Sequence, residues 1–228
     1  MSPEPTATPA PPAGAALRPS QAEPVGWTDL VASLDGCRAD RNGPAVTGIT
    51  LDSRQVRPGD LYVGLRGLHA HGAKFAVSAT EAGAVAVLTD SDGAKLAAEA
   101  HVPIIVVDDP RAAMAVAAAR IFGHPSDAMT MFGITGTNGK TTTAFLVEAG
   151  LRAAGHCVGT IGTIGFRLDG EELPSARTTV TTPESPDLQG LFAAMAERGA
   201  SDVVMEVSSH ALALQRVDGT CFDAVSYT

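Results

Sequence analysis

The segment Gly133–Thr143 holds the residues of this chain best suited to chemistry, since it reads Gly-Ile-Thr-Gly-Thr-Asn-Gly-Lys-Thr-Thr-Thr. A short apolar run precedes it and a helical pattern follows, so the glycines fall at a strand-to-helix turn. Gly136 and Gly139 let backbone N–H groups approach a polyphosphate, and the opening helix adds the positive end of its dipole. We expect Lys140 to contact the β- and γ-phosphates of a nucleotide, and the Thr141 hydroxyl to bind Mg²⁺.

The spacing of this loop is compressed relative to the standard phosphate-binding motif. That motif has a glycine five positions before the one that precedes the lysine, and Ile134 stands there in this chain. A glycine turn with a surface lysine is the alternative interpretation, but the order of strand, turn and helix favours a nucleotide site. The residues predicted to bind ATP are Gly136, Thr137, Asn138, Gly139, Lys140, Thr141 and Thr142.

Glu206 is the second candidate, because it lies near the end of an expected strand at 202–207. Ligands of open α/β sheets lie outside the carboxyl ends of the strands, which is also where the phosphate loop falls. A carboxylate facing Thr141 there would complete the ligands of a Mg²⁺ that bridges the phosphates. A glutamate paired with a cation at a strand end is the alternative, and the spacing leaves the two interpretations open.

The composition and charge of the chain exclude several classes of function. The chain has 228 residues, 45% of them hydrophobic, and a net charge of −9 with no basic stripe, which argues against a nucleic-acid partner. Cys37, Cys157 and Cys221 are far apart and odd in number, so a reducing cytoplasm is the simplest location. The apolar runs are of strand length and no secretory signal is present, so we expect a cytoplasmic protein that makes no contact with a membrane. We also expect it to be a monomer.

The chain divides into three parts. Residues 1–26 hold seven of the fifteen prolines and are expected to form a disordered tail. Hydrophobic periodicity predicts a small α/β domain over 27–126 and a second α/β unit over 127–228 that stops on a strand. The first has expected strands at 46–50, 61–65, 84–88 and 104–107 and helices at 28–34, 73–82, 94–100 and 111–122. The second has expected strands at 129–134, 158–164, 202–207 and 223–227 and helices at 141–154 and from 185.

Two motifs carry a resemblance to a known family. The compressed loop Thr-Gly-Thr-Asn-Gly-Lys-Thr-Thr and the run Glu206-Val-Ser-Ser-His210 resemble the Mur ligases, over about residues 27–228. The resemblance implies an α/β protein: a small N-terminal UDP-binding domain, then an incomplete P-loop-type, mainly parallel-sheet ATP-binding domain. It also implies that the domain gripping the incoming amino acid is missing, so the sequence resembles an N-terminal fragment.

The resemblance assigns roles in the second unit. Lys140 and Glu206 would be catalytic, with Thr141 and Glu206 as metal ligands. The pair Thr181 and Thr182 would contact the peptidyl part of the substrate, and Ser208 and Arg216 would bind the same substrate. The family has a glutamine two positions before that arginine, where this chain has Leu214 with Gln215 adjacent. His210 has no metal-binding motif around it and is interpreted as structural.

The first unit resembles the UDP-holding domain of the same ligases, through Leu51-Asp-Ser-Arg, a Pro-Gly-Asp-Leu turn and a His-Gly loop. Leu51, Ser53 and the loop near His69 would touch the UDP. Without the resemblance, these residues predict only strand, turn and polar loop. His69 and His71 could form a zinc pair, but no third ligand is near. The run Gly159–Gly165 has the spacing GxxGxxG and is therefore not a dinucleotide fingerprint.

The function that the resemblance implies is an ATP-dependent amide-bond ligase of peptidoglycan precursor synthesis. It would add diaminopimelate to UDP-N-acetylmuramoyl-L-alanyl-D-glutamate through an acyl phosphate, with ATP and Mg²⁺. One alternative is an inactive nucleotide-sugar-binding module. Another keeps the ligase chemistry with lysine, a folate or another muramoyl peptide, although the Asp52-Ser-Arg54 domain argues against a folate enzyme.

Overall fold

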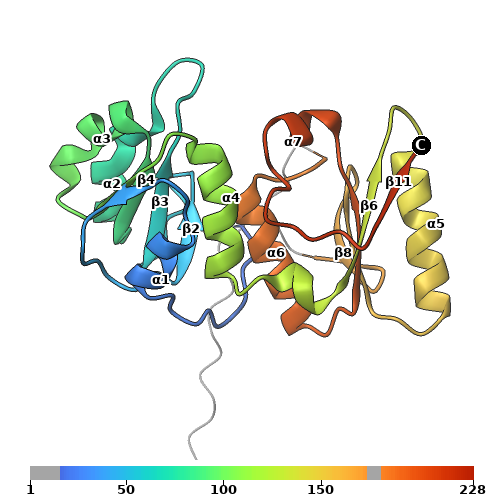
Figure 1. The fold of residues 1–228 in the computed structure, drawn as a ribbon. Coiled ribbons are helices and arrows are strands. Elements are labelled where there is room, and N and C mark those ends of the chain that lie inside the picture. Colours follow the sequence, from blue (N-terminus) through green and yellow to red (C-terminus); the bar gives the residue numbers. More distant parts are fainter. Residues whose placement is uncertain (1–15, 174–180) are drawn as a thin grey trace, which may run out of the picture.

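The computed structural model describes residues 16–173 and 181–228, which form two β-sheets with helices packed around them (Figure 1). The first sheet has the strand order β1-β5-β4-β3-β2, in which β2 to β5 run parallel and β1 is an antiparallel edge. Its strands are β1 (Arg38–Ala39), β2 (Gly48–Thr50), β3 (Asp60–Gly64), β4 (Ala86–Thr89) and β5 (Ile104–Val106).

Both faces of the first sheet are covered, because alternate residues of each strand point to opposite sides. Leu61 and Val63 pack under α1 (Trp27–Ala32) and α4 (Pro110–Ile121). Tyr62, between them in β3, faces the other side, under the 3-10 turn Gly72–Phe75, α2 (Ala76–Glu81) and α3 (Ser91–Ala97). We call this sheet with its helices the first unit.

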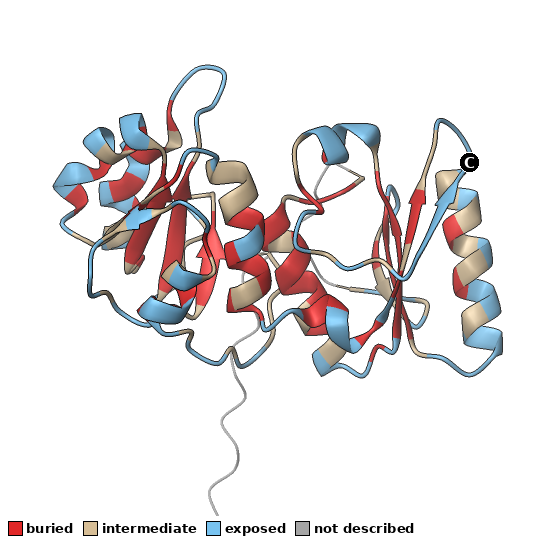
Figure 2. Ribbon diagram, viewed as in Figure 1, coloured by how far each residue is buried: buried red, intermediate tan, exposed pale blue. Residues whose placement is uncertain are grey.

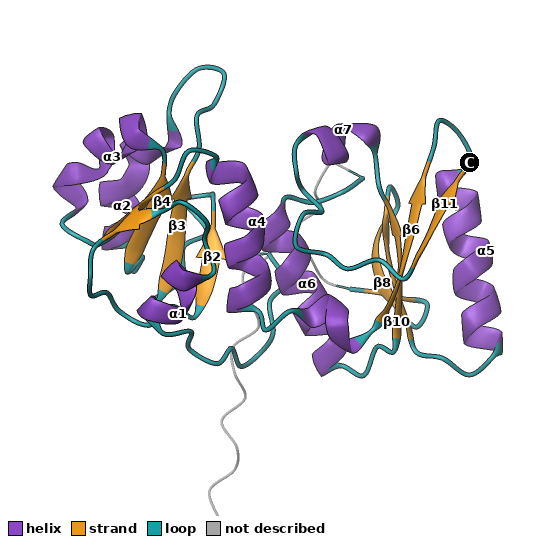
Figure 3. Cartoon of the chain, viewed as in Figure 1, coloured by secondary structure: helices purple, strands orange, loops and turns teal. Residues whose placement is uncertain are grey.

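The second sheet has the order β11-β6-β10-β7-β8-β9. The strands β11, β6, β10 and β7 run parallel, and the β7-β8-β9 edge is antiparallel. Its strands are β6 (Thr130–Thr135), β7 (Val158–Gly162), β8 (Gly165–Leu168), β9 (Glu171–Glu172), β10 (Asp202–Glu206) and β11 (Ala224–Tyr227). The helices α5 (Lys140–Ala153) and α6 (Ser185–Glu197) cover opposite faces, and the short α7 (Ser209–Ala213) follows β10 (Figure 3). This is the second unit.

The two units meet where α4 lies against α6 (Figure 1). Glycines allow the close approach: a Cβ on Gly190 of α6 would lie 3.4 Å from the Phe122 ring, and one on Gly219 would lie 3.0 Å from the Ala115 carbonyl. Burial is continuous across this junction (Figure 2).

The predicted α/β class, with a first α/β region and a mainly parallel sheet after it, is confirmed, whereas the domain boundaries stay predictions. The prediction of a disordered tail is wrong for residues 16–26, because these residues pack against both units. Arg18 forms a buried ion pair with Asp60, Ser20 hydrogen-bonds Glu197, and Val25 bridges to Val46. Residues 1–15 of that tail lie outside the described residues.

The sequence-based expectation also missed short elements. The run 158–164 was expected to be one strand, but it turns after Gly162 and returns as β8 and β9. The strand β1 and the helix α7 were not predicted either. None of the described helices is long and apolar enough to cross a lipid bilayer.

Candidate functional site

The predicted phosphate loop connects β6 to α5 and has the backbone that such a loop needs. Gly136 and Gly139 have φ values of 138° and 82°, a region that favours glycine. Gly139 is the N-cap of α5, with no side chain to accept a hydrogen bond, and the first backbone bond runs from Thr143 N–H to its carbonyl, 2.8 Å. Among the described residues, none accepts a hydrogen bond from the Lys140 or Thr141 N–H groups. The helix start therefore presents donors to an anion.

Side chains and a neighbouring strand hold the loop in shape. Lys140 Nζ donates to the Gly136 carbonyl at 2.8 Å, so its cation lies over the turn. Thr137 N–H donates to the Thr228 carbonyl at 3.1 Å, and the Thr228 hydroxyl donates to the Asn138 carbonyl at 2.7 Å. A Cβ on Gly136 would lie 1.9 Å from the Thr228 carbonyl oxygen. Only glycine fits at position 136 in this arrangement.

Glu206, at the end of β10, is buried beside the loop. Its Oε2 accepts from Thr141 Oγ1 at 3.0 Å, and its Oε1 accepts from the Thr163 N–H at 3.0 Å. A Cβ on Gly162 would lie 2.2 Å from Oε1, so the glycine makes room for the carboxylate. The recorded partners of Glu206 among the described residues are neutral, which gives the cation-paired alternative no support.

The donor set suits a magnesium nucleotide. Thr141 and Glu206 place a hydroxyl and a carboxylate oxygen together, and Mg²⁺ prefers such hard oxygen ligands. The adjoining loop offers a lysine cation and backbone donors, which suit the phosphates.

Three predicted substrate residues gather on the other side of Glu206. Thr182, which is buried, donates from Oγ1 to the Glu206 carbonyl at 3.0 Å and accepts from the Ser208 N–H at 3.3 Å. Ser208 caps α7 by accepting from the Ala211 N–H at 3.1 Å. Thr181 lies 3.2 Å from Thr163 between the hydroxyl oxygens. The structure therefore brings Thr181, Thr182 and Ser208 to one place.

Arg216 joins this group through Thr182. Its Nη1 donates to the Thr182 carbonyl at 3.0 Å, and its Nε donates to Glu184 Oε1 at 3.0 Å. Arg111 of α4 pairs with the other oxygen of Glu184 at 2.8 Å. Sequence reasoning missed Arg111 and the Glu184 pairing. Glu184 follows the predicted pair Thr181 and Thr182 by two residues, but no spacing rule connects it to an arginine 73 residues earlier.

The predicted nucleotide-sugar residues lie in the first unit. Leu51 and Ser53 follow β2, and His69 is exposed in the loop after β3, so all three lie beyond the carboxyl ends of neighbouring parallel strands. The Gly67 N–H donates to the Ala70 carbonyl at 3.0 Å and closes the turn that carries His69.

The zinc-pair alternative is not supported. His71 is buried, its Nδ1 accepts from the Ala73 N–H at 3.1 Å, and its Nε2 faces Asp90 at 3.2 Å. Both ring nitrogens are therefore engaged within the protein. Over 16–173 and 181–228, no group of three or more His, Cys, Asp or Glu side chains is arranged to hold a metal.

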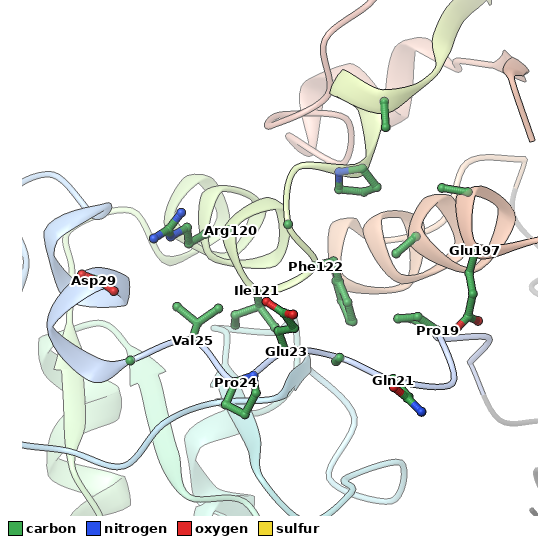
Figure 4. A pocket seen from close by; sticks show the side chains of 17 residues that line it. Pro19, Gln21, Glu23, Pro24, Val25, Asp29, Arg120, Ile121, Phe122 and Glu197 are labelled. Carbon is green, nitrogen blue, oxygen red and sulfur yellow. The ribbon is translucent and has the colours of Figure 1, made fainter. Parts of the chain in front are cut away.

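A separate cavity of about 570 Å³ lies between the first unit and α6 (Figure 4). Gln21, Pro24, Arg120, Phe122 and Glu197 are among the residues that line it. None of the predicted site residues lines this cavity, so it is distinct from the group around Glu206.

Comparison with known proteins agrees with this geometry. The family model "Mur ligase middle domain" matches residues 134–228, and "Mur ligase family, catalytic domain" matches residues 45–121. The chain belongs to the Mur ligase family. Together the two matches cover β2 to β5 of the first sheet and all strands of the second sheet except most of β6, including the phosphate loop from Ile134 onward and Glu206.

Individual relatives show which Mur ligases this chain is similar to. This Mur ligase chain is 52% identical over 206 residues to UDP-N-acetylmuramoyl-L-alanyl-D-glutamate–2,6-diaminopimelate ligase of Streptomyces avermitilis, covering 90% of this chain and 40% of the relative. It is 50% identical to the ligase of that name from Corynebacterium glutamicum, covering 87% and 39%. A solved structure of a ligase with this name has a TM-score of 0.65 at 26% identity, covering 80% and 36%. The chain thus spans about 40% of the length of these curated relatives.

Proposed function

We propose that this Mur ligase chain supplies the UDP-substrate and ATP-binding parts of an ATP-dependent amide-bond ligase. The reaction adds diaminopimelate to UDP-N-acetylmuramoyl-L-alanyl-D-glutamate. The names of the relatives at 50% and 52% identity support this substrate pair, with lysine as the alternative amino acid. We propose the cytoplasm as its location and a monomer as its state.

The observation that carries the proposal is the contact of 3.0 Å between Thr141 Oγ1 and Glu206 Oε2 beside the phosphate loop. MgATP, when bound, would supply the phosphoryl group that turns the poor acyl donor, a carboxylate, into an acyl phosphate with release of ADP, and the incoming amine would then displace phosphate to form the amide. Thr141 and Glu206 would hold the metal, and Lys140 would offset phosphate charge. Gly136, Asn138, Gly139 and Thr142 would complete the cradle with their backbone N–H groups, and Thr137 would join them in the loop, although its own N–H donates to the Thr228 carbonyl in this structure.

The substrate would extend between the units. Leu51, Ser53 and His69 would contact the UDP, whereas Thr181, Thr182, Ser208 and Arg216 would contact the peptidyl part. Catalysis would then consist of aligning the reacting carboxylate with the phosphoryl group and neutralising charge, the two effects that dominate phosphoryl transfer.

Calorimetry tests the proposal. The chain should bind MgATP, and Lys140→Ala should lower that affinity by at least tenfold, because the lysine is the cation of the loop. Lys95→Ala, which removes an exposed lysine from α3, is the matched control and should bind as the wild type does. Binding of the UDP-muramoyl dipeptide without MgATP would instead favour a nucleotide-sugar-binding module.

A further inference from the structure

Arg111, in the first turn of α4, reaches from the first unit to the second. Its Nη1 donates to Glu184 Oε2 at 2.8 Å and to the Leu214 carbonyl at 3.2 Å. The other carboxylate oxygen of Glu184 pairs with Arg216 Nη2 at 2.9 Å. Glu184 is therefore shared between two arginines, one from each unit.

Arg111, Glu184 and Arg216 form a cluster whose net charge depends on Arg111. Arg216 and Glu184 alone would form a neutral pair, and Arg111 gives the three side chains a net charge of +1. The side chains of Arg216, Glu184 and Arg111 are 10%, 19% and 30% exposed, so water screens their charges only partly. The carboxylate of Asp109, which caps the helix that carries Arg111, balances the remaining charge, so the effect of Arg111 is to leave Arg216 able to offset a ligand carboxylate.

Arg216 also keeps hydrogen-bonding capacity. A guanidinium has five N–H donors, and three of those of Arg216 point at Thr182 and Glu184. Among the described residues, one N–H on Nη1 and one on Nη2 have no partner, and a carboxylate can accept two such hydrogen bonds from a guanidinium.

The turn that carries Arg216 is held to α4 by a second contact. Gln215, with a left-handed φ of 54°, donates from Nε2 to Asp109 Oδ2 at 3.1 Å. Asp109 is also the N-cap of α4 and accepts from the Arg111 N–H at 3.0 Å. The start of α4 thus anchors the turn 214–216 next to Thr182, whose hydroxyl donates to the Glu206 carbonyl.

We propose that Arg111 is a positioning residue for the peptidyl carboxylate of the substrate. By offsetting the charge of Glu184 and fixing its direction, Arg111 leaves Arg216 available to a carboxylate instead of neutralised by Glu184. This inference rests on the proposed function, in which Arg216 contacts the peptidyl part of the substrate.

The first experiment compares two ligands by calorimetry: UDP-N-acetylmuramoyl-L-alanyl-D-glutamate and UDP alone. Arg111→Ala should weaken binding of the dipeptide ligand about tenfold, the effect of one hydrogen bond to a charged group. Binding of UDP should stay within twofold, because UDP has no peptidyl carboxylate. Arg120→Ala is the matched control, since it removes the same charge from the last turn of the same helix; both ligands should bind it as they bind the wild type.

A double-mutant cycle then separates positioning from a general loss of charge. In a Glu184→Gln background no carboxylate neutralises Arg216, so adding Arg111→Ala should cost less than threefold in affinity for the dipeptide ligand. A long-range charge effect would instead cost the same factor in both backgrounds. Arg111→Lys, which restores the charge but not the fork of donors, should recover part of the affinity.

The outcomes separate the two proposals. If the wild type binds the dipeptide ligand and Arg111→Ala binds it equally well, the inference about Arg111 is wrong while the proposed function stands. Equal weakening of both ligands, or an additive cycle, also overturns the inference by indicating a general structural role. If the wild type binds neither MgATP nor the dipeptide ligand, the proposed function fails, and the role of Arg111 fails with it.

Discussion

The first sheet is covered by helices on both faces, whereas the second sheet leaves its β11 edge exposed (Figure 2). Large side chains such as Leu61, Leu88 and Ile105 are fully buried in the first sheet. In the second, Val225 and Tyr227 are 66% and 79% exposed, and the cluster under α5 has four buried members.

Buried polar side chains, in contrast to buried apolar ones, are more numerous in the second unit. Glu206 and Thr182 are buried in the second unit and joined by a hydrogen bond, whereas the buried polar groups of the first unit are fewer and include Asp60, which is paired with Arg18. Buried polar groups are tolerated only where they are paired, and they add less to stability than apolar packing does. The two units therefore differ in where their polar groups lie: the second gathers oxygen atoms and donors around Glu206, at the carboxyl ends of its strands.

The largest expected effect is a loss of stability caused by a substitution in the first sheet. Leu88→Ala should lower the free energy of unfolding by about 2–5 kcal/mol, because it leaves a cavity in a fully buried site. Val225→Ala in β11 should change it by less than about 0.5 kcal/mol, since that side chain is largely exposed. Urea unfolding monitored by circular dichroism measures both. Similar losses in the two variants would remove the contrast between the sheets.

The next effect is a pH dependence at the boundary of the units. Burial raises the pKa of Asp187, in the first turn of α6, from 3.8 to about 6; the nearby Arg18 lowers it, and Glu184 and Asp52 raise it. The folded state therefore holds the proton more tightly than the unfolded chain. The resulting stabilisation is complete below about pH 3.8 and is lost as the pH rises through about 6.

Asp187→Asn should consequently stabilise the protein at pH 8 relative to the wild type, by up to about 3 kcal/mol, and should add little at pH 4. Urea midpoints at the two pH values, compared between the two proteins, measure this difference. Asp218→Asn removes an exposed carboxylate and serves as the control. An equal gain at both pH values would mean that the Asp187 carboxyl is not protonated preferentially in the folded protein.

A smaller loss of stability is expected from a substitution at Gly162, which lies against the carboxylate of Glu206. Gly162→Ala would bring a Cβ within 2.2 Å of Glu206 Oε1, so the carboxylate must move. We expect a loss of about 1–3 kcal/mol in stability, together with weaker binding of MgATP, because Glu206 would leave Thr141. Thermal unfolding and calorimetry report the two effects. Unchanged MgATP affinity would separate Glu206 from the nucleotide site.

Local patterns predicted the parts of this molecule that depend on local physics. The glycine turn, the lysine and the helix start lie within eight residues, and alternating apolar residues were enough to place most strands. The Thr141–Glu206 contact spans 65 residues, but it followed from both residues lying at the carboxyl edge of one parallel sheet. Their roles as metal ligands stay predictions.

Contacts that no local pattern encodes were missed. Arg18 lies in a proline-rich segment that has little to bury, yet its guanidinium is held by Asp60 and by the Ile49 carbonyl. Arg111 reads as a first-turn helix residue, and only the packing of α4 on α6 brings it to Glu184. Both errors arise because ion pairs between units are set by tertiary packing.

The smallest predicted effect is a gain in the second unit, on the helix that begins at the phosphate loop. Gly150 lies inside α5, and a Cβ there would meet nothing within 4 Å. Gly150→Ala should therefore raise the free energy of unfolding by about 0.5–1 kcal/mol, because alanine loses less backbone entropy on forming a helix. The substitution lies near the end of α5 remote from Lys140 and Thr141, so MgATP affinity should not change. Calorimetry and urea unfolding on the same preparation check both statements. A gain in stability accompanied by weaker MgATP binding would mean that the loop needs a flexible α5, and that stability and ligand binding are coupled along this helix.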